Sequence, residues 1–118
     1  MPHVKLEYTE NVQWKNPIRD IFPKLQTVLI QHARVKSENC KSRAMELKDY
    51  YCTSKSHSGG FIHLEISLLS GRAEKVRTNI GNECRKIIQS FIENTAEIQV
   101  SVELRDMDQN SYFTTNQL

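Results

Sequence analysis

The chain has 118 residues, the usual size of one domain, and we expect residues 1–118 to fold as a single unit. Its 16 basic and 14 acidic residues give a formal net charge of +2 without a basic block, which does not indicate nucleic-acid binding. No apolar stretch is long enough to span a membrane, and the first residues lack the apolar part of a signal peptide. We therefore expect a cytoplasmic protein with neither a nucleic acid nor a membrane as partner.

The cysteines and histidines are scattered along the chain. There are three cysteines and four histidines, without a Cys-x-x-Cys pair or the short spacing of zinc ligands. We expect reduced thiols and no metal site. The residues are Cys40, Cys52, Cys84, His3, His32, His57 and His63.

The first half of the chain predicts a strand, a helix and a second strand. Apolar and polar residues alternate over residues 2–8, as in a strand with one buried face. Apolar residues at steps of three and four predict an amphipathic helix over residues 17–32, with Asn16 as its N-cap. Pro23 leaves the start of the regular helix open by one turn. Alternation and two adjacent tyrosines then predict a strand over residues 43–52.

The second half repeats this order. A polar loop over residues 53–60 separates the halves. Alternation predicts a strand over residues 62–68, helical spacing predicts a helix over residues 73–91, and a last strand covers residues 98–104.

Two consecutive β-α-β units, about residues 2–52 and 61–105, are followed by a C-terminal tail, residues 106–118. Parallel pairing within each unit predicts an α+β fold, a four-stranded mixed sheet with two helices on one face. Such a sheet has free edges and a far face that can be apolar, and association would cover both, so we expect a symmetric oligomer. A ferredoxin-like module of unrelated function has the same pattern, so function must be argued from the site.

Pro2 follows the initiator methionine and heads the first predicted strand. If Met1 is removed, Pro2 becomes a secondary amine held in a fixed place. An α-amino group has a pKa of about 7.7 to 8.0, which burial or nearby cations lower, so this amine could act as a base near neutral pH. The alternative is a proline without a catalytic role, since a strand's first position needs no N–H.

Two arginines lie at the ends of predicted elements. Arg43 opens the second strand, and Arg72 follows Gly71 at the start of the second helix. The helix dipole disfavours a cation there, which favours a functional role for Arg72. A guanidinium binds a carboxylate through two parallel hydrogen bonds. The alternative for both residues is an ordinary solvated arginine.

Several short segments spread over the chain form one pattern. The segments are Pro2-His3 with Glu7 and Asn11, Ser42-Arg43, Phe61-Ile62-His63-Leu64, Gly71-Arg72 with Glu74 and Arg77, residues 102–104, and Tyr112-Phe113 with Asn116. Together they resemble 5-carboxymethyl-2-hydroxymuconate isomerase of the tautomerase superfamily. Glu74 departs by one place from the spacing of the family's Gly-Arg-x-x-Glu-x-x-Arg motif.

The resemblance implies a homotrimer of doubled β-α-β subunits that needs no cofactor or metal. Its substrate would be a carboxylated dienol formed during homoprotocatechuate breakdown. Pro2 would carry a proton from the 2-hydroxyl to a distal carbon, while Arg43 and Arg72 hold carboxylates. These two cations would also lower the pKa of Pro2 and stabilise the dienolate. Lys41 stands where the resemblance suggests a further basic residue, and a lysine there is a point charge.

The sequence leaves two other functions open. A related tautomerase could act on a smaller enol, and a trimeric binding protein could keep the fold without the chemistry. The role of four aromatic residues is also open. The aromatic residues at strand ends could wall the pocket or pack in a core or interface. They are Tyr50, Phe61, Tyr112 and Phe113.

Overall fold

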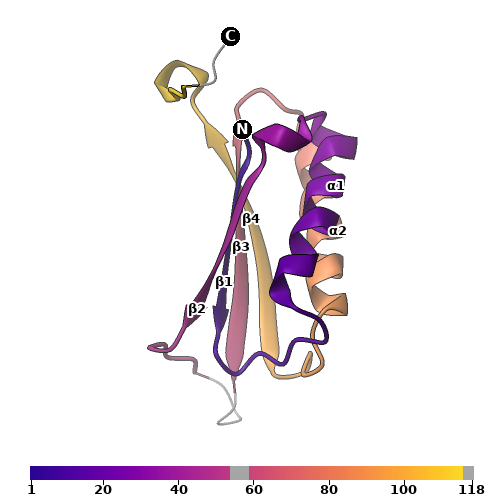
Figure 1. Ribbon diagram of the computed structural model, residues 1–118, viewed down its shortest axis with the longest axis vertical. Helices are drawn as coiled ribbons and strands as arrows, with labels where there is room; N and C mark the ends of the chain where they lie inside the picture. The colour runs from indigo at the N-terminus through magenta and orange to yellow at the C-terminus, as the bar shows by residue number, and fades with distance from the viewer. Residues whose placement is uncertain (54–58, 116–118) are drawn as a thin grey trace.

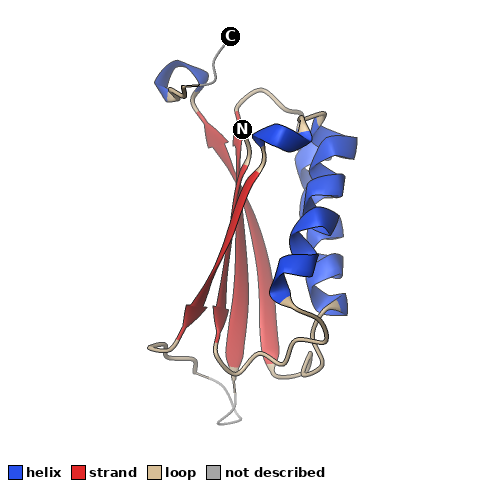
Figure 2. Ribbon diagram, in the orientation of Figure 1, coloured by secondary structure: helices blue, strands red, loops and turns tan. Residues whose placement is uncertain are grey.

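The computed structural model describes residues 1–53 and 59–115, and its strands form one mixed sheet with two helices packed on one face (Figure 1; Figure 2). This arrangement confirms the predicted fold class. His57 and Asn116, and most of the predicted loop, lie outside the described residues. The elements are β1 (His3–Thr9), α1 (Ile21–Ala33), β2 (Lys41–Leu47), β3 (Gly60–Leu69), α2 (Glu74–Ser90) and β4 (Ile98–Met107).

The strand order is β2-β1-β3-β4. β1 and β2 are parallel, β3 and β4 are parallel, and the central pair of β1 and β3 is antiparallel. The two β-α-β units therefore run in opposite directions. As a result, β1 and β2 begin at one end of the sheet, and β3 and β4 begin at the other (Figure 1).

The predicted limits of the second strand are wrong at both ends. β2 begins at Lys41, so Arg43 is its third residue and does not open it. It ends at Leu47, whereas Tyr50 and Tyr51 follow outside the strand. The tyrosines favour strands intrinsically, but β1 also ends at this level, because Thr9 pairs with Leu47.

α1 begins within the one-turn range that Pro23 left open, and α2 begins one residue later than predicted. α1 starts at Ile21, after a short 3-10 turn over Ile18–Asp20. Pro23 lies in the first turn of α1, where its missing N–H removes no helical hydrogen bond. α2 starts at Glu74, so Arg72 precedes it. Neither helix in the described part of the chain is long and apolar enough to cross a membrane.

The core lies between the sheet and the helices. Every second residue of β3 is buried, as the two-residue period predicts. Burial of this apolar surface is the main favourable contribution to folding. Fully buried side chains in this layer include Leu6, Leu25, Leu29, Ile62, Leu64, Ile66, Ile80 and Ile88.

The far face of the sheet is charged, and the expectation that it could be apolar is wrong. Lys5 lies 3.5 Å from Glu65, and Arg105 lies 3.9 Å from Glu65 and 3.0 Å from Glu103. His63 adds a contact of 3.3 Å to Glu103. Ion pairs with at least one exposed partner contribute little to stability, so this face is compatible with water. The outer strands β2 and β4 are therefore the features that favour association.

Candidate active site

Pro2 is buried at the start of β1, and its carbonyl accepts a hydrogen bond of 3.0 Å from the Lys41 N–H. This bond joins the starts of β1 and β2 and holds the main chain at the head of the sheet. With Met1 in place, the Pro2 nitrogen is an amide and the free amino group belongs to Met1. That amino group donates to the Asn39 carbonyl.

The surroundings of the terminal amine favour its neutral form. Burial is the main cause that lowers the pKa of the Met1 amino group, and the cations Lys41 and Arg72 lower it further, while Cys40 acts in the opposite direction. From the sequence, this effect was expected of Arg43 and Arg72. In the structure, Lys41 acts on the amine together with Arg72.

Arg43 lies on the face of the sheet that the helices do not cover. It pairs in register with Lys5, whose neighbours Val4 and Leu6 point into the core. The Arg43 Nη1 is 3.1 Å from Nδ1 of His3. Its side chain also lines a small cavity of about 160 Å³, together with Lys5, Glu7, Met45 and Glu65.

Arg72 contacts the other layer of the molecule. Its Nη1 donates to the Leu69 carbonyl at 2.7 Å, and its Nη2 donates to the Ala33 carbonyl at 3.2 Å. Its Nε is buried without a hydrogen-bond partner among the described residues. Ala33 is the last residue of α1, so the guanidinium lies at the negative end of that helix dipole. The sequence expectation considered the dipole of α2 alone, and the structure adds this favourable contact with the end of α1, which gives Arg72 a structural role.

Lys41 acts on the terminal amine, as Arg72 does, and on His3, as Arg43 does. Its ammonium donates to the Glu38 carbonyl at 2.9 Å. Its charge contributes to lowering the pKa both of the terminal amine and of His3.

His3 is a residue of this site that sequence reasoning did not assign. The segment that follows β4 also reaches this end of the sheet, since His3 Nε2 lies 2.9 Å from the Tyr112 hydroxyl and the two rings pack edge to face. Alternation places His3 on the same face as Arg43, but the contact also requires the β1–β2 register. Sequence spacing alone does not supply that register.

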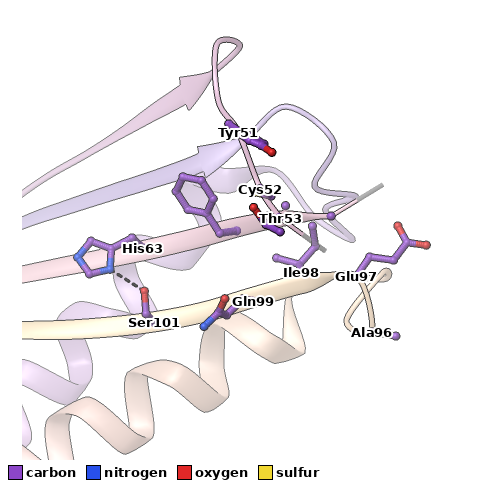
Figure 3. A pocket seen from close by; sticks show the side chains of 12 residues that line it. Tyr51, Cys52, Thr53, His63, Ala96, Glu97, Ile98, Gln99 and Ser101 are labelled. Atoms are coloured by element: carbon purple, nitrogen blue, oxygen red, sulfur yellow. Dashed lines mark hydrogen bonds between the residues drawn. The ribbon is translucent and has the colours of Figure 1, made fainter. Parts of the chain in front are cut away.

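A larger cleft of about 600 Å³ lies at the opposite end, where β3 and β4 begin (Figure 3). His63 Nδ1 is 2.6 Å from the Ser101 hydroxyl within it. Among the described residues that line it there is neither lysine nor arginine, and Glu97 contributes a carboxylate. Phe61 lines this cleft, so it is far along the sheet from Pro2.

The other predicted aromatic residues differ in position. Tyr112 lies at the Pro2 end through its contact with His3. Phe113 is largely exposed, and Tyr50 is partly buried beyond the end of β2. Among the described histidine, cysteine, aspartate and glutamate residues, no group of three or more could hold a metal ion.

Comparison with known proteins identifies the family. A family described as 5-carboxymethyl-2-hydroxymuconate isomerase matches residues 2–118. The chain belongs to this family. The resemblance seen in the sequence is thereby confirmed, and so is a cofactor-independent isomerase function of the tautomerase type.

Solved structures of the same fold support this membership. A 5-carboxymethyl-2-hydroxymuconate isomerase from Deinococcus radiodurans R1 is 25% identical, with a TM-score of 0.82 over 98% of this chain and 90% of that chain. A protein described as "Q0 fused 4-OT wild type symmetric trimer" is 11% identical, with a TM-score of 0.77 over 98% and 94%. A macrophage migration inhibitory factor-like protein from Entamoeba histolytica is 10% identical, with a TM-score of 0.68 over 96% and 94%. The last two show the fold alone. No curated protein matches the chain.

Proposed function

We propose that this isomerase converts 5-carboxymethyl-2-hydroxymuconate, or a similar carboxylated dienol, to its oxo isomer during aromatic catabolism, such as homoprotocatechuate breakdown. The N-terminal proline, Pro2, is the proton carrier. The observation that carries this proposal is the environment at the head of β1, where Pro2 is buried and where burial, Lys41 and Arg72 lower the pKa of the Met1 amino group; removal of Met1 would place the Pro2 amine beside the same groups. Family membership supports the class of substrate.

The reaction moves one proton and needs no other reactant. Once Met1 is removed, the Pro2 nitrogen takes the proton of the 2-hydroxyl, and the electron pair of that O–H bond spreads over the dienolate. The protonated amine then returns the proton to a distal carbon, where a C–H bond forms as the oxygen becomes a carbonyl. A base with a pKa near the working pH suits both steps.

Three cations are the proposed binding residues for the substrate's carboxylates and for the dienolate charge. Arg43 is exposed and presents a planar fork suited to a carboxylate. Arg72 already donates both Nη groups to carbonyls, so we assign it mainly the role of a fixed positive charge. Lys41 adds a point charge that acts on both the terminal amine and His3. A substrate with carboxylates at both ends would reach across the end of the sheet.

We infer that the protein is a homotrimer located in the cytoplasm. β2 is exposed along nearly its whole length and is an outer strand of the sheet, which suits pairing with a second copy. Two proteins of this fold are described as symmetric trimers. The free cysteines fit a reducing compartment.

The test combines intact-mass measurement with a kinetic assay. The mature chain should lack Met1. Ultraviolet absorbance should show ketonisation of 5-carboxymethyl-2-hydroxymuconate, and Pro2→Ala should lower kcat by about 10²-fold, the lower range for loss of a general base, because alanine keeps a primary amine. His63→Gln, in the opposite cleft, is the control.

Each alternative gives a different result. An unchanged rate in Pro2→Ala, or a retained Met1 in the active protein, would contradict the proline mechanism. Faster turnover of a small monocarboxylated enol than of the dienol would assign the protein to a related tautomerase. Tight binding of the dienol without turnover would indicate a binding protein.

A further inference from the structure

Both ring nitrogens of His3 contact groups with defined hydrogen-bonding roles. Nδ1 is 3.1 Å from the Arg43 Nη1, and Nε2 is 2.9 Å from the Tyr112 hydroxyl. A guanidinium has only donors, so Nδ1 must accept and cannot carry a proton in this arrangement. The neutral ring therefore carries its proton on Nε2, which donates to Tyr112.

The charges around His3 favour this neutral ring. Burial is the main cause that lowers the pKa of His3, and Arg43 is the next. Smaller contributions come from the terminal amine, Lys41 and Lys5. β3 places Ser67 opposite His3, with Arg105 of β4 beyond it, and Glu65 next along β3 faces Lys5. These strands also carry the acidic residues Glu7, Glu46, Glu65, Glu103 and Asp106, but every charged group that acts on the pKa of His3 is a cation.

Protonation would disrupt this contact. A doubly protonated imidazole has donors on both nitrogens, so it cannot accept a hydrogen bond from Arg43 and repels the guanidinium instead. The arginine side chain is exposed and long, and without the acceptor it regains rotamer freedom that binding would have to remove. The orientation of Arg43 therefore depends on the charge state of His3.

Building on the proposed function, we propose that His3 is a positioning residue. As a neutral, Nε2-protonated imidazole it holds the Arg43 guanidinium ready for a substrate carboxylate and links it to the C-terminal segment through Tyr112. Acid conditions release the guanidinium. The site then binds dicarboxylated substrates less well, while Pro2 remains in place.

The first test does not use activity. Nitrogen-15 NMR of the histidine rings in the full chain should show His3 as the Nε2–H tautomer, titrating below the ordinary value of 6.5. Arg43→Gln should raise this pKa toward 6.5, because it removes the neighbouring cation. A proton on Nδ1 at neutral pH, or a pKa unmoved by Arg43→Gln, would overturn the proposal.

The second test is kinetic. His3→Phe keeps the ring shape but removes the acceptor, and should raise KM for the dienol about tenfold, as for one hydrogen bond to a charged group. His3→Gln can accept from Arg43 and donate to Tyr112, so its KM should stay near wild type. Below pH 6.5, KM of the wild type should rise relative to that of His3→Gln, whereas His63→Gln should follow the wild type.

These outcomes separate the two proposals. If Pro2→Ala is inactive but His3→Phe leaves KM unchanged, the positioning role is wrong and the proline mechanism stands. If Pro2→Ala is fully active, the proposed function fails, while the NMR titration still decides the contact of His3 with Arg43. Identical pH dependence of KM in the wild type and His3→Gln would refute the acid release.

Discussion

The two β-α-β halves share one plan, but the ends of the sheet where they begin differ in charge. Where β1 and β2 begin, His3 pairs in register with Lys41, and Lys5 pairs with Arg43. This end also carries the chain's own amine, with a pKa lowered mainly by burial. It is therefore cationic and holds a potential base.

The corresponding positions of the second half are neutral or nearly so. Where β3 and β4 begin, Phe61 pairs with Gln99, and His63 pairs with Ser101. The cleft here is larger than the cavity beside Arg43, yet it lacks a terminal amine and has no arginine or lysine in its described lining (Figure 3). Cavity size therefore does not locate the chemistry. A repeated fold has only one N-terminus, and only one end can use it.

Gly60, beside the cleft at the neutral end, is itself tightly packed, and we expect Gly60→Ala to lower the stability of the protein. An added Cβ would lie 2.4 Å from both Thr9 Oγ1 and Asn11 Oδ1 and disrupt their 2.6 Å hydrogen bond. Overpacking of this kind costs about 1–3 kcal/mol. Chemical denaturation should show the loss, while kcat/KM of the folded protein should persist.

Gly81→Ala is the matched control for that change. Its added Cβ would meet Leu104 Cδ1 at 3.8 Å, an ordinary contact, inside α2. Replacing a helical glycine by alanine should stabilise by about 0.5–1 kcal/mol. A neutral Gly60→Ala would show that Thr9 and Asn11 move aside without loss and that the neutral end is not tightly packed.

The two arginines of the cationic end should differ in how much they contribute to stability. Arg72→Gln loses the hydrogen bonds to Ala33 and Leu69 and should destabilise by about 1–2 kcal/mol, since the side chain is partly exposed. Arg43 lies on an exposed outer strand, so Arg43→Gln should change stability by less than about 0.5 kcal/mol. Urea denaturation of both variants measures the difference, and equal losses would contradict it.

Arg72 should also affect how the activity depends on pH. Arg72 contributes to lowering the pKa of the terminal amine, because a cation disfavours the ammonium form. In Arg72→Gln that pKa should rise, so the amine stays protonated to a higher pH. The acid limb of the kcat/KM profile should therefore shift to higher pH. An unmoved limb in Arg72→Gln would show that this charge does not act on the base.

Sequence pattern predicted the fold well because the core follows simple periods. The alternation of apolar and polar residues in β3 and the repeated order of strand, helix and strand were sufficient to predict the fold, because both patterns follow from which side chains are buried. The contacts of the site were harder. Arg72 bonds to Ala33, which lies 39 residues earlier in the other half, and His3 meets Tyr112 from the far end of the chain. Local spacing does not report such long-range partners.

The smallest expected effect comes from giving the neutral end the charges of the other end. Gln99→Lys with Ser101→Arg would place cations at the register positions that correspond to Lys41 and Arg43. Both side chains are exposed, so stability should change by no more than about 0.5 kcal/mol per site. In a protein that keeps Pro2, kcat/KM of the double variant should stay within about twofold of wild type, a difference of under about 0.5 kcal/mol in transition-state stabilisation.

The same double substitution should also be made in the Pro2→Ala variant, where it shows whether cations alone can restore the activity. If a terminal amine and cations are both required, the new cationic cleft should not restore the lost activity, because β3 begins with a main-chain amide rather than an amine. The ultraviolet assay measures this directly, and the transferred cations can be checked separately by binding of the dienol. Binding without turnover would assign the cations to substrate binding and the proton transfer to the amine. Restored turnover would mean that charge alone is enough and that the difference between the two ends is not one of chemistry.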